Sequence, residues 1–329
     1  MKFGGTSVAD PEKIQRAASR AIAQKKRGGG VVVIVSAPGD MTDELLLLSR
    51  HIAKNPSGRE VDQLITTGDT VGISLFAMAC AAKGFLSISL TAAQAGIKAR
   101  GRHTEAEIVF VEPTRLFSEL KRGRIVVVAG FQGLNLKGDI LSLGRGGSDL
   151  TAVALAAALQ ADSCEIFTDV KGIYTADPRI VSEARLLREI SLLEMIALSK
   201  SGAEVMQLRS LEIARKNNVI IHVRSAFHPQ KGTLIVPGEP PGGRASVSAL
   251  SLKKNTQDLT ATVSLVGAQV GSDQELKKNV LKSLTTRRIK TISVSQAPLR
   301  LSIAMRRKDA DSALRLIHKI CHLEHEHSF

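Results

Sequence analysis

The sequence predicts an α/β protein: an α/β/α sandwich with a mostly parallel sheet, followed by a small α+β domain. β-branched runs of strand length, such as 31–35 and 125–128, alternate with long stretches of helical periodicity, such as 61–83. This alternation favours parallel strands. Strands that are apolar on both faces need helices on both sides of the sheet, and ligands of such sheets bind beyond the carboxyl ends of the strands.

The first predicted helix begins at Asp10 and Pro11, which form a favourable helix start, and it runs to the glycines at 28–30. A strand at 31–35 follows directly. The other predicted elements of this domain are strands at 125–128, 166–168 and 219–223 and helices at 61–83, 149–160 and 203–216.

A stretch rich in proline and glycine at 237–243 interrupts this pattern, so we expect one domain over residues 1–240 and a second over 245–329. The second domain is predicted to be α+β, with split β-α-β character. Its expected elements are strands near 247–252 and 261–266, a helix at 273–287, strands around 291–294 and 299–305, and a helix from Asp309.

Composition limits the function. The net charge is +14, but aromatic residues make up 3% of the chain and Trp is absent, so no platform for stacking bases is visible and no nucleic-acid partner is expected. Three scattered cysteines indicate reduced core thiols. The apolar runs are shorter than a bilayer requires, and the N-terminus resembles no targeting signal, so we expect a cytoplasmic protein without a membrane partner. The tail at 321–327 is interpreted as a frayed, solvated segment, with no metal site.

Two glycine-containing loops precede helices and are candidates for binding phosphate. The first, 2–7, offers the backbone amides of Gly4 and Gly5 together with the charge of Lys2. The second, 143–149, reads Leu-Gly-Arg-Gly-Gly-Ser-Asp and opens the predicted helix at 149–160. A helix cap requires neither three glycines nor an arginine, so the second loop favours phosphate binding over capping alone. The loop lacks both the P-loop pattern and G-x-G-x-x-G, so the chain is not predicted to be a P-loop NTPase.

The third loop, 168–179, follows a strand and combines carboxylates, a lysine, an arginine and the only tyrosine, a set suited to a nucleotide. Its Asp177 and Pro178 could also form no more than a turn.

Together these segments resemble the amino-acid kinase superfamily, and specifically the aspartokinases. The second domain resembles an ACT domain. The resemblance lies in residues 2–8, 35–37, 67–68, 94–97, 130–133, 144–149, 168–181 and 222–225.

The resemblance implies roles for individual residues. Lys2 and Asp149 would be catalytic, Lys2 by stabilising charge on the transferred phosphoryl group and Asp149 by orienting the phosphate-binding groups. Phosphate would be bound by Gly4, Gly5, Ser36, Gly146 and Gly147; the amino acid by Thr42, Asp69, Arg145 and Ser148; and the nucleotide by Thr168, Asp169, Tyr174, Asp177 and Arg179.

Four departures from the family pattern are visible. Asp69 stands where the family has glutamate, and Glu204 stands where it has lysine near the nucleotide. The chain begins one residue before Lys2, so we expect either a clipped first strand or a true start upstream. One set of ACT elements fits between 247 and 329, where relatives carry two, so we expect weak or absent feedback inhibition by lysine or threonine.

The expected function is therefore ATP- and Mg²⁺-dependent phosphorylation of the side-chain carboxylate of L-aspartate, the first step in biosynthesis of lysine, threonine and methionine. The ACT-like domain would support a homodimer. Two alternatives stay open: a sibling kinase with another small acid as acceptor, and a catalytically weak regulatory subunit.

Overall fold

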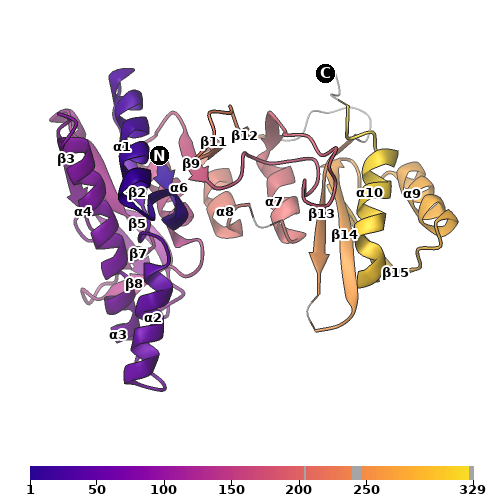
Figure 1. The fold of residues 1–329 in the computed structure, drawn as a ribbon, viewed down its shortest axis with the longest axis horizontal. Coiled ribbons are helices and arrows are strands. Elements are labelled where there is room, and N and C mark those ends of the chain that lie inside the picture. The colour runs from indigo at the N-terminus through magenta and orange to yellow at the C-terminus, as the bar shows by residue number, and fades with distance from the viewer. Residues whose placement is uncertain (204, 239–245, 256, 326–329) are drawn as a thin grey trace. The chain divides into compact units, whose positions relative to one another are not determined.

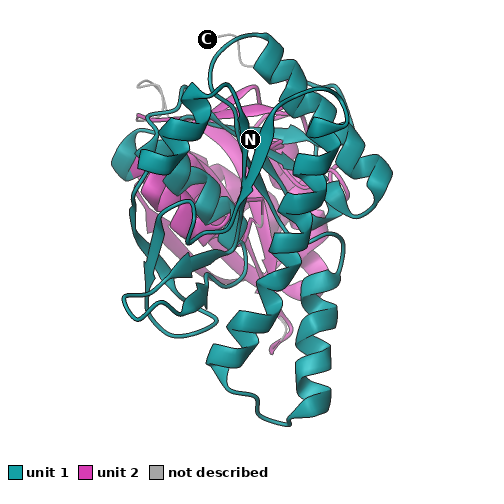
Figure 2. Ribbon diagram, turned by 90° about the vertical axis from the view of Figure 1, so that its left-hand side faces the viewer, with its two compact units in different colours: residues 1–171, 216–230 teal, residues 172–215, 231–329 magenta. Residues whose placement is uncertain are grey.

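The computed structural model describes residues 1–203, 205–238, 246–255 and 257–325 (Figure 1). The chain divides into two compact units, coloured separately in Figure 2. Unit 1 contains Met1–Lys171 and Lys216–Gln230, and unit 2 contains Gly172–Arg215 and Lys231–Phe329. The predicted linker at 237–243 lies mostly outside the described residues, and the domain boundary placed there stays a prediction.

Unit 1 is built on a parallel sheet in the strand order β11-β9-β1-β2-β6-β3, which confirms the predicted fold class. Its strands are β1 (Lys2–Phe3), β2 (Val32–Val35), β3 (Ser87–Leu90), β6 (Ile125–Ala129), β9 (Cys164–Thr168) and β11 (Ile221–Ser225). The short β1 lies between β2 and β9, so the residues that follow it emerge at the middle of the carboxyl edge.

Helices cover both faces of this sheet. Helices α1 (Pro11–Lys26) and α4 (Thr67–Ala81) pack on one face, and α5 (Thr114–Lys121) and α6 (Gly147–Ala158) pack on the other. Asp10 begins α1 as predicted, because its side chain accepts a hydrogen bond from the backbone N–H of Lys13 at 2.8 Å. Each central strand is therefore buried on both sides.

The aromatic ring of Phe3 fixes β1 in the core of unit 1. It stacks on Phe167 of β9 with ring centroids 4.7 Å apart and lies 5.7 Å from the ring of Phe76 on α4. All three rings are almost completely buried. A two-residue strand is thus held by aromatic packing as well as by its ladder.

Some helices differ from the sequence prediction. The segment predicted as one helix at 61–83 consists of α3 (Gly58–Ile65) and α4, which meet at Thr66; both bury apolar faces, so the periodicity does not reveal the junction. The helix predicted at 203–216 begins only at Leu208, as α8 (Leu208–Asn217). Helices α2 (Met41–Ile52) and α7 (Leu192–Lys200) were not predicted, although the Ser191 and Glu194 capping box that starts α7 is readable in the sequence.

One stretch in the described part of the chain, Gly58–Ala81, is long and apolar enough to cross a membrane by length and composition, contrary to the expectation from apolar runs. Half of its most apolar window is buried, and it carries the buried carboxylates Asp62 and Asp69, which bond to other segments of unit 1. These contacts are those of a core helix.

A second, smaller sheet of unit 1 has the order β5-β4-β7-β8. Its strands are β4 (Ile97–Arg100), β5 (Glu107–Val111), β7 (Gln132–Leu134) and β8 (Ile140–Ser142). Asp62 of α3 fastens this sheet: its fully buried carboxylate accepts hydrogen bonds from the Ser142 hydroxyl at 2.5 Å and the Thr104 backbone N–H at 3.1 Å, and lies 2.8 Å from the His103 ring. None of these short strands was predicted.

Unit 2 contains the predicted α+β arrangement. Its antiparallel sheet has the order β13-β14-β16-β15, with α7 on one face and α9 and α10 on the other (Figure 1). The elements are β13 (Ser246–Lys254), β14 (Thr260–Ala268), α9 (Gln274–Thr286), β15 (Thr291–Ala297), β16 (Arg300–Arg306) and α10 (Ala310–Ile320), and two short strands, β10 (Glu189–Ser191) and β12 (Thr233–Val236), pair in parallel. From β14 onward the order is β-α-β-β-α, as in an ACT-like fold, and β13 pairs with the free edge of β14.

The prediction of a frayed tail is wrong for residues 321–325. Leu323 is 1% exposed and belongs to the core of unit 2, and its carbonyl accepts a hydrogen bond from Arg185 Nε at 3.1 Å. Burial of the leucine side chain explains the docking. The rest of the predicted tail, 326–329, lies outside the described residues.

The Asp62 network predicts a large effect on stability. Replacing Asp62 with alanine leaves buried donors unsatisfied, so we expect the free energy of unfolding to fall by about 3 kcal/mol, measured by denaturant titration. Arg59→Ala on the same helix is the matched control, because its ion pairs with Glu60 and Asp139 are exposed and contribute little. Equal stability of the Asp62→Ala variant and the unaltered protein would contradict this account.

Candidate active site

An ion pair lies at the centre of the carboxyl edge of the main sheet. Lys2 Nζ of β1 is 2.6 Å from Asp149 Oδ1 in the first turn of α6, and both side chains are 13% exposed. The two residues predicted to be catalytic are therefore brought together although they are far apart in the sequence. The ammonium group of Lys2 is thus exposed enough to contact a ligand, and the ion pair fixes its position.

Two glycines shape the loop after β1. A Cβ on Gly4 would lie 3.4 Å from Lys2 Nζ, so the lysine side chain folds back over this residue. A Cβ on Gly5 would lie 2.8 Å from the carbonyl oxygens of both Ala37 and Gly39, a distance that real side chains do not adopt. Gly5 is required here because the loop after β1 packs directly on the loop after β2.

The predicted phosphate loop at 143–149 forms a tight turn into α6. Gly144 and Gly146 both have φ +72°, the left-handed region that favours glycine. Gly147 is closely packed, since a Cβ there would lie 2.8 Å from Leu143 Cβ. The turn leaves the amide end of α6, with its partial positive charge, beside Lys2, an arrangement suited to an anion.

Ser36, predicted to bind phosphate, contacts Ser148, which is predicted to bind the amino acid. Ser36, just after β2, donates a hydrogen bond from its hydroxyl to that of Ser148 on α6 at 2.9 Å, and this bond ties the two loops together. Thr42 is half-buried in the first turn of α2, and Arg145 is exposed in the turn before α6. Whether these residues contact an amino acid stays a prediction.

Asp69 lies deeper than a surface-binding role requires. It is 1% exposed on α4, and its Oδ1 accepts a hydrogen bond from the Ala37 backbone N–H at 3.0 Å. Its Oδ2 has no hydrogen-bond partner within the described residues. Burial raises the pKa of this carboxyl well above its ordinary value, against the opposing effect of the amide hydrogen bond.

The predicted nucleotide residues are divided between the units. In unit 1, the Thr168 hydroxyl at the end of β9 donates to Asp169 Oδ1 at 3.0 Å. In unit 2, Tyr174 forms an isolated bridge with Leu186, and Arg179 Nη2 donates to Asp177 Oδ2 at 2.8 Å within a turn. This ion pair holds the pKa of Asp177 below its ordinary value. Glu204 lies outside the described residues.

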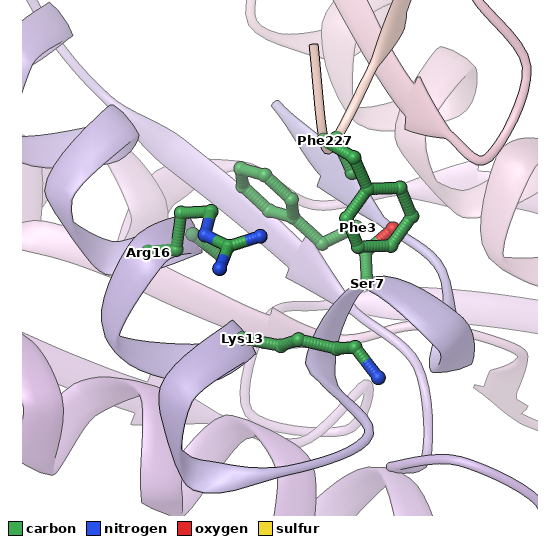
Figure 3. A pocket seen from close by; sticks show the side chains of 7 residues that line it. Phe3, Ser7, Lys13, Arg16 and Phe227 are labelled. Atoms are coloured by element: carbon green, nitrogen blue, oxygen red, sulfur yellow. The ribbon is translucent and has the colours of Figure 1, made fainter.

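Sequence reasoning did not identify a small pocket beside the first loop. Figure 3 shows Lys13 and Arg16 extending from α1 toward Phe3 and Ser7, with Phe227 on the other side. Ser7 is 3% exposed, and its hydroxyl has no hydrogen-bond partner within the part of the chain that is described. The basic helix face was readable in the sequence, but the approach of Phe227 depends on tertiary folding.

Comparison with known families and sequences gives consistent results. The amino acid kinase family matches residues 1–225. The aspartokinase of Mycobacterium bovis is 50% identical over 236 residues, which are 71% of this chain and 56% of the relative. Aspartokinase 2 of Bacillus subtilis is 51% identical over 234 residues, 71% and 57% of the two chains. The matched region thus spans little more than half the length of these relatives.

Solved structures agree in fold. Aspartate kinase from Synechocystis is 30% identical, with a TM-score of 0.66 over 98% of this chain and 69% of that one. Aspartokinase III of E. coli, in complex with aspartate and ADP, is 20% identical, with a TM-score of 0.83 over 97% of this chain and 98% of that one. At this lower identity the likeness concerns the fold alone.

The family match covers more than half of the chain, and residues 1–225 include both glycine loops described above. The resemblance predicted from the sequence is confirmed. The chain belongs to the amino acid kinase family and is similar to the aspartokinases within it.

Proposed function

We propose that this protein transfers the γ-phosphoryl group of ATP to the side-chain carboxylate of L-aspartate, which yields 4-phospho-L-aspartate and opens the biosynthesis of lysine, threonine and methionine. The observation that carries the proposal is the Lys2–Asp149 pair beside the amide end of α6. Similarity to aspartokinases at 50% identity, and to an aspartate kinase of solved structure at 30% identity, supports the choice of substrates.

In this proposal the chain acts by positioning and electrostatics. The aspartate carboxylate attacks the γ-phosphorus in line, the bond from phosphorus to the bridging oxygen of ADP breaks, and no protein nucleophile takes part. Lys2 stabilises the negative charge that develops on the transferred group. Gly4, Gly5, Gly146 and Gly147 would let the phosphates approach the backbone, because glycine has no side chain.

Mg²⁺ fits this edge of unit 1. The ion prefers oxygen ligands and is commonly held by one or two carboxylates together with substrate phosphates and water. Asp149 supplies a carboxylate beside Lys2. The described residues contain no group of three or more His, Cys, Asp or Glu side chains that could hold a metal ion by themselves. Asp149 would therefore hold the ion with the phosphates, and the bound ion would neutralise phosphate charge.

The acceptor site is proposed to use Arg145 for a carboxylate and Asp69 for the ammonium group, with Thr42 and Ser148 beside them. The unpartnered Oδ2 of Asp69 supports this assignment. A buried carboxyl with a raised pKa is costly to ionise, and an ammonium ligand would lower that cost. Thr168, Asp169, Tyr174, Asp177 and Arg179 stay the proposed nucleotide residues.

Assembly and location complete the proposal. The outer strand β15 of the ACT-like sheet is largely exposed, with Ile292 55% exposed, and an open strand edge supports pairing of two copies. A homodimer is proposed on this ground. Weak or absent feedback inhibition and a cytoplasmic location are proposed from the sequence alone.

The first prediction concerns catalysis by Lys2. With ATP, L-aspartate and hydroxylamine, we expect aspartyl hydroxamate to form, and we expect Lys2→Ala to reduce kcat by about 10²–10³-fold, because a charge that acts on the transition state is lost. Glutamate is the control acceptor, and Lys13→Ala on the nearby α1 is the control for loss of a surface lysine.

Two outcomes would redirect the proposal. Hydroxamate from another small acid and none from aspartate would favour a sibling kinase. A folded protein that binds ATP poorly and forms no hydroxamate would favour the regulatory-subunit alternative.

A second prediction concerns pH and Asp69. The pKa of Asp69 is higher in the folded chain than in the unfolded chain, so between these two values the folded chain holds a proton that the unfolded chain has lost. The stability that this proton contributes is fully present below the ordinary pKa of aspartate. It is lost as the pH rises through the folded-state pKa. Asp69→Asn keeps the shape without the titration. The unfolding free energy of the variant should therefore increase relative to the unaltered protein as pH rises.

The measurement is denaturant unfolding of both proteins at several pH values. Curves that stay parallel from acid to neutral pH would show that Asp69 does not titrate as described. In the assay, the same variant should raise KM for aspartate by about tenfold, the effect of one charged hydrogen bond, while KM for ATP is little changed.

A further inference from the structure

The segment 172–187 carries Tyr174, Asp177 and Arg179, and the structure groups it with the ACT-like elements in unit 2. Ala176 and Val181 of this segment are 3% and 2% exposed and belong to the same apolar core as β14, α9 and α10. Tyr174, Asp177 and Arg179, which are predicted to bind the nucleotide, thus lie in a segment that packs in the core of the ACT-like module.

Thr175 is bonded through both its backbone and its hydroxyl. Its backbone N–H donates to the Arg185 carbonyl at 2.9 Å, and its carbonyl accepts from the Leu250 N–H of β13 at 2.7 Å. Its hydroxyl accepts from the Arg185 backbone N–H at 3.0 Å. Since Thr175 directly follows Tyr174 and lies two residues before Asp177, its position determines where both side chains begin.

The remaining contact of the Thr175 hydroxyl is the ring of His318 on α10, whose Nε2 lies 3.0 Å away. His318 is 2% exposed, its Nδ1 faces Glu324 Oε2 at 4.0 Å, and burial lowers its pKa. The hydroxyl already accepts a bond from Arg185, so it is best satisfied by donating its proton to Nε2 of a neutral ring. In that tautomer Nδ1 carries the proton and points toward Glu324.

Three further bonds join α10 and the chain after it to the same segment. Arg315 Nη1 donates to the Ile180 carbonyl at 3.0 Å, and Arg185 donates from Nε to the Leu323 carbonyl at 3.1 Å and from Nη2 to the His325 carbonyl. All three lie at the margin of the core, where water can replace them. The bond between Thr175 and His318 is buried, where no water replaces it, so among the bonds to α10 and the chain after it, this one is the most costly to lose.

We infer that His318 is a positioning residue for the nucleotide: through the Thr175 hydroxyl, α10 of the ACT-like module holds Tyr174 and the Asp177–Arg179 pair in their places. This inference rests on the proposed kinase function and on the assignment of those residues to the nucleotide. A change in α10 then alters nucleotide affinity without altering the Lys2–Asp149 pair.

The test compares His318→Ala and His318→Gln in the full chain. The alanine variant removes the acceptor and should raise KM for ATP about fivefold to tenfold, the effect of a lost buried hydrogen bond, with kcat and KM for aspartate changed less than twofold. The glutamine variant offers an amide oxygen near the position of Nε2 and should restore most of the affinity. Leu284→Ala, buried on α9 in the same core, is the control for lost stability.

Thr175→Val supplies the second half of a double-mutant cycle. If the two side chains act through one bond, the double variant Thr175→Val with His318→Ala should raise KM for ATP no further than either single variant. Additive effects would overturn the inference, as would an unchanged KM in His318→Ala, or an equal rise in Leu284→Ala.

Failure of the inference can be separated from failure of the proposed function. The dissociation constant of ADP, measured by calorimetry on the same variants, needs no acceptor and should follow the pattern expected for KM. An unaltered protein that binds ADP but phosphorylates no aspartate would contradict the proposed function, and the ADP affinities of the variants would still decide the role of His318.

Discussion

The position of β1 at the centre of a parallel sheet is the constraint on which the candidate site depends. The two residues of β1 have different roles. Phe3 stacks on Phe167 and holds the strand in the core, and Lys2 lies at the carboxyl edge, 2.6 Å from Asp149. Because the strands on either side of β1 are parallel to it, their following loops meet at the same edge. The close packing of Gly5 on the loop after β2 completes that edge.

The contacts within unit 2 hold the segment that is predicted to bind the nucleotide, and they are also the proposed route of regulation. Its antiparallel sheet and helices form an apolar core that includes Ala176 and Val181 of the segment predicted to meet the nucleotide. A buried hydrogen bond between Thr175 and His318 then links that segment to the final helix. An ACT-like module that pairs with another copy, as proposed, would in this way influence the nucleotide through bonds within its own unit.

Much of this structure could be predicted from local sequence, and the rest required tertiary contacts. The helix start at Asp10, the glycine turn at 144–147 and the six-element α+β module all follow from residue types and periodicity. The small sheet was missed because its strands are three to five residues long and lack clear alternation. Burial of Asp69 and Leu323 was also missed, since it is determined by segments distant in sequence.

The most direct test of the account follows the oxygen of the acceptor. L-aspartate labelled with oxygen-18 in its side-chain carboxylate is incubated with ATP and hydroxylamine, and the released phosphate is examined by mass spectrometry. Attack by the carboxylate followed by hydroxylamine at the carbonyl carbon leaves the labelled bridging oxygen on phosphate, so the account predicts labelled inorganic phosphate. Unlabelled phosphate would mean that water attacks ATP, which would contradict aspartate phosphorylation at this site.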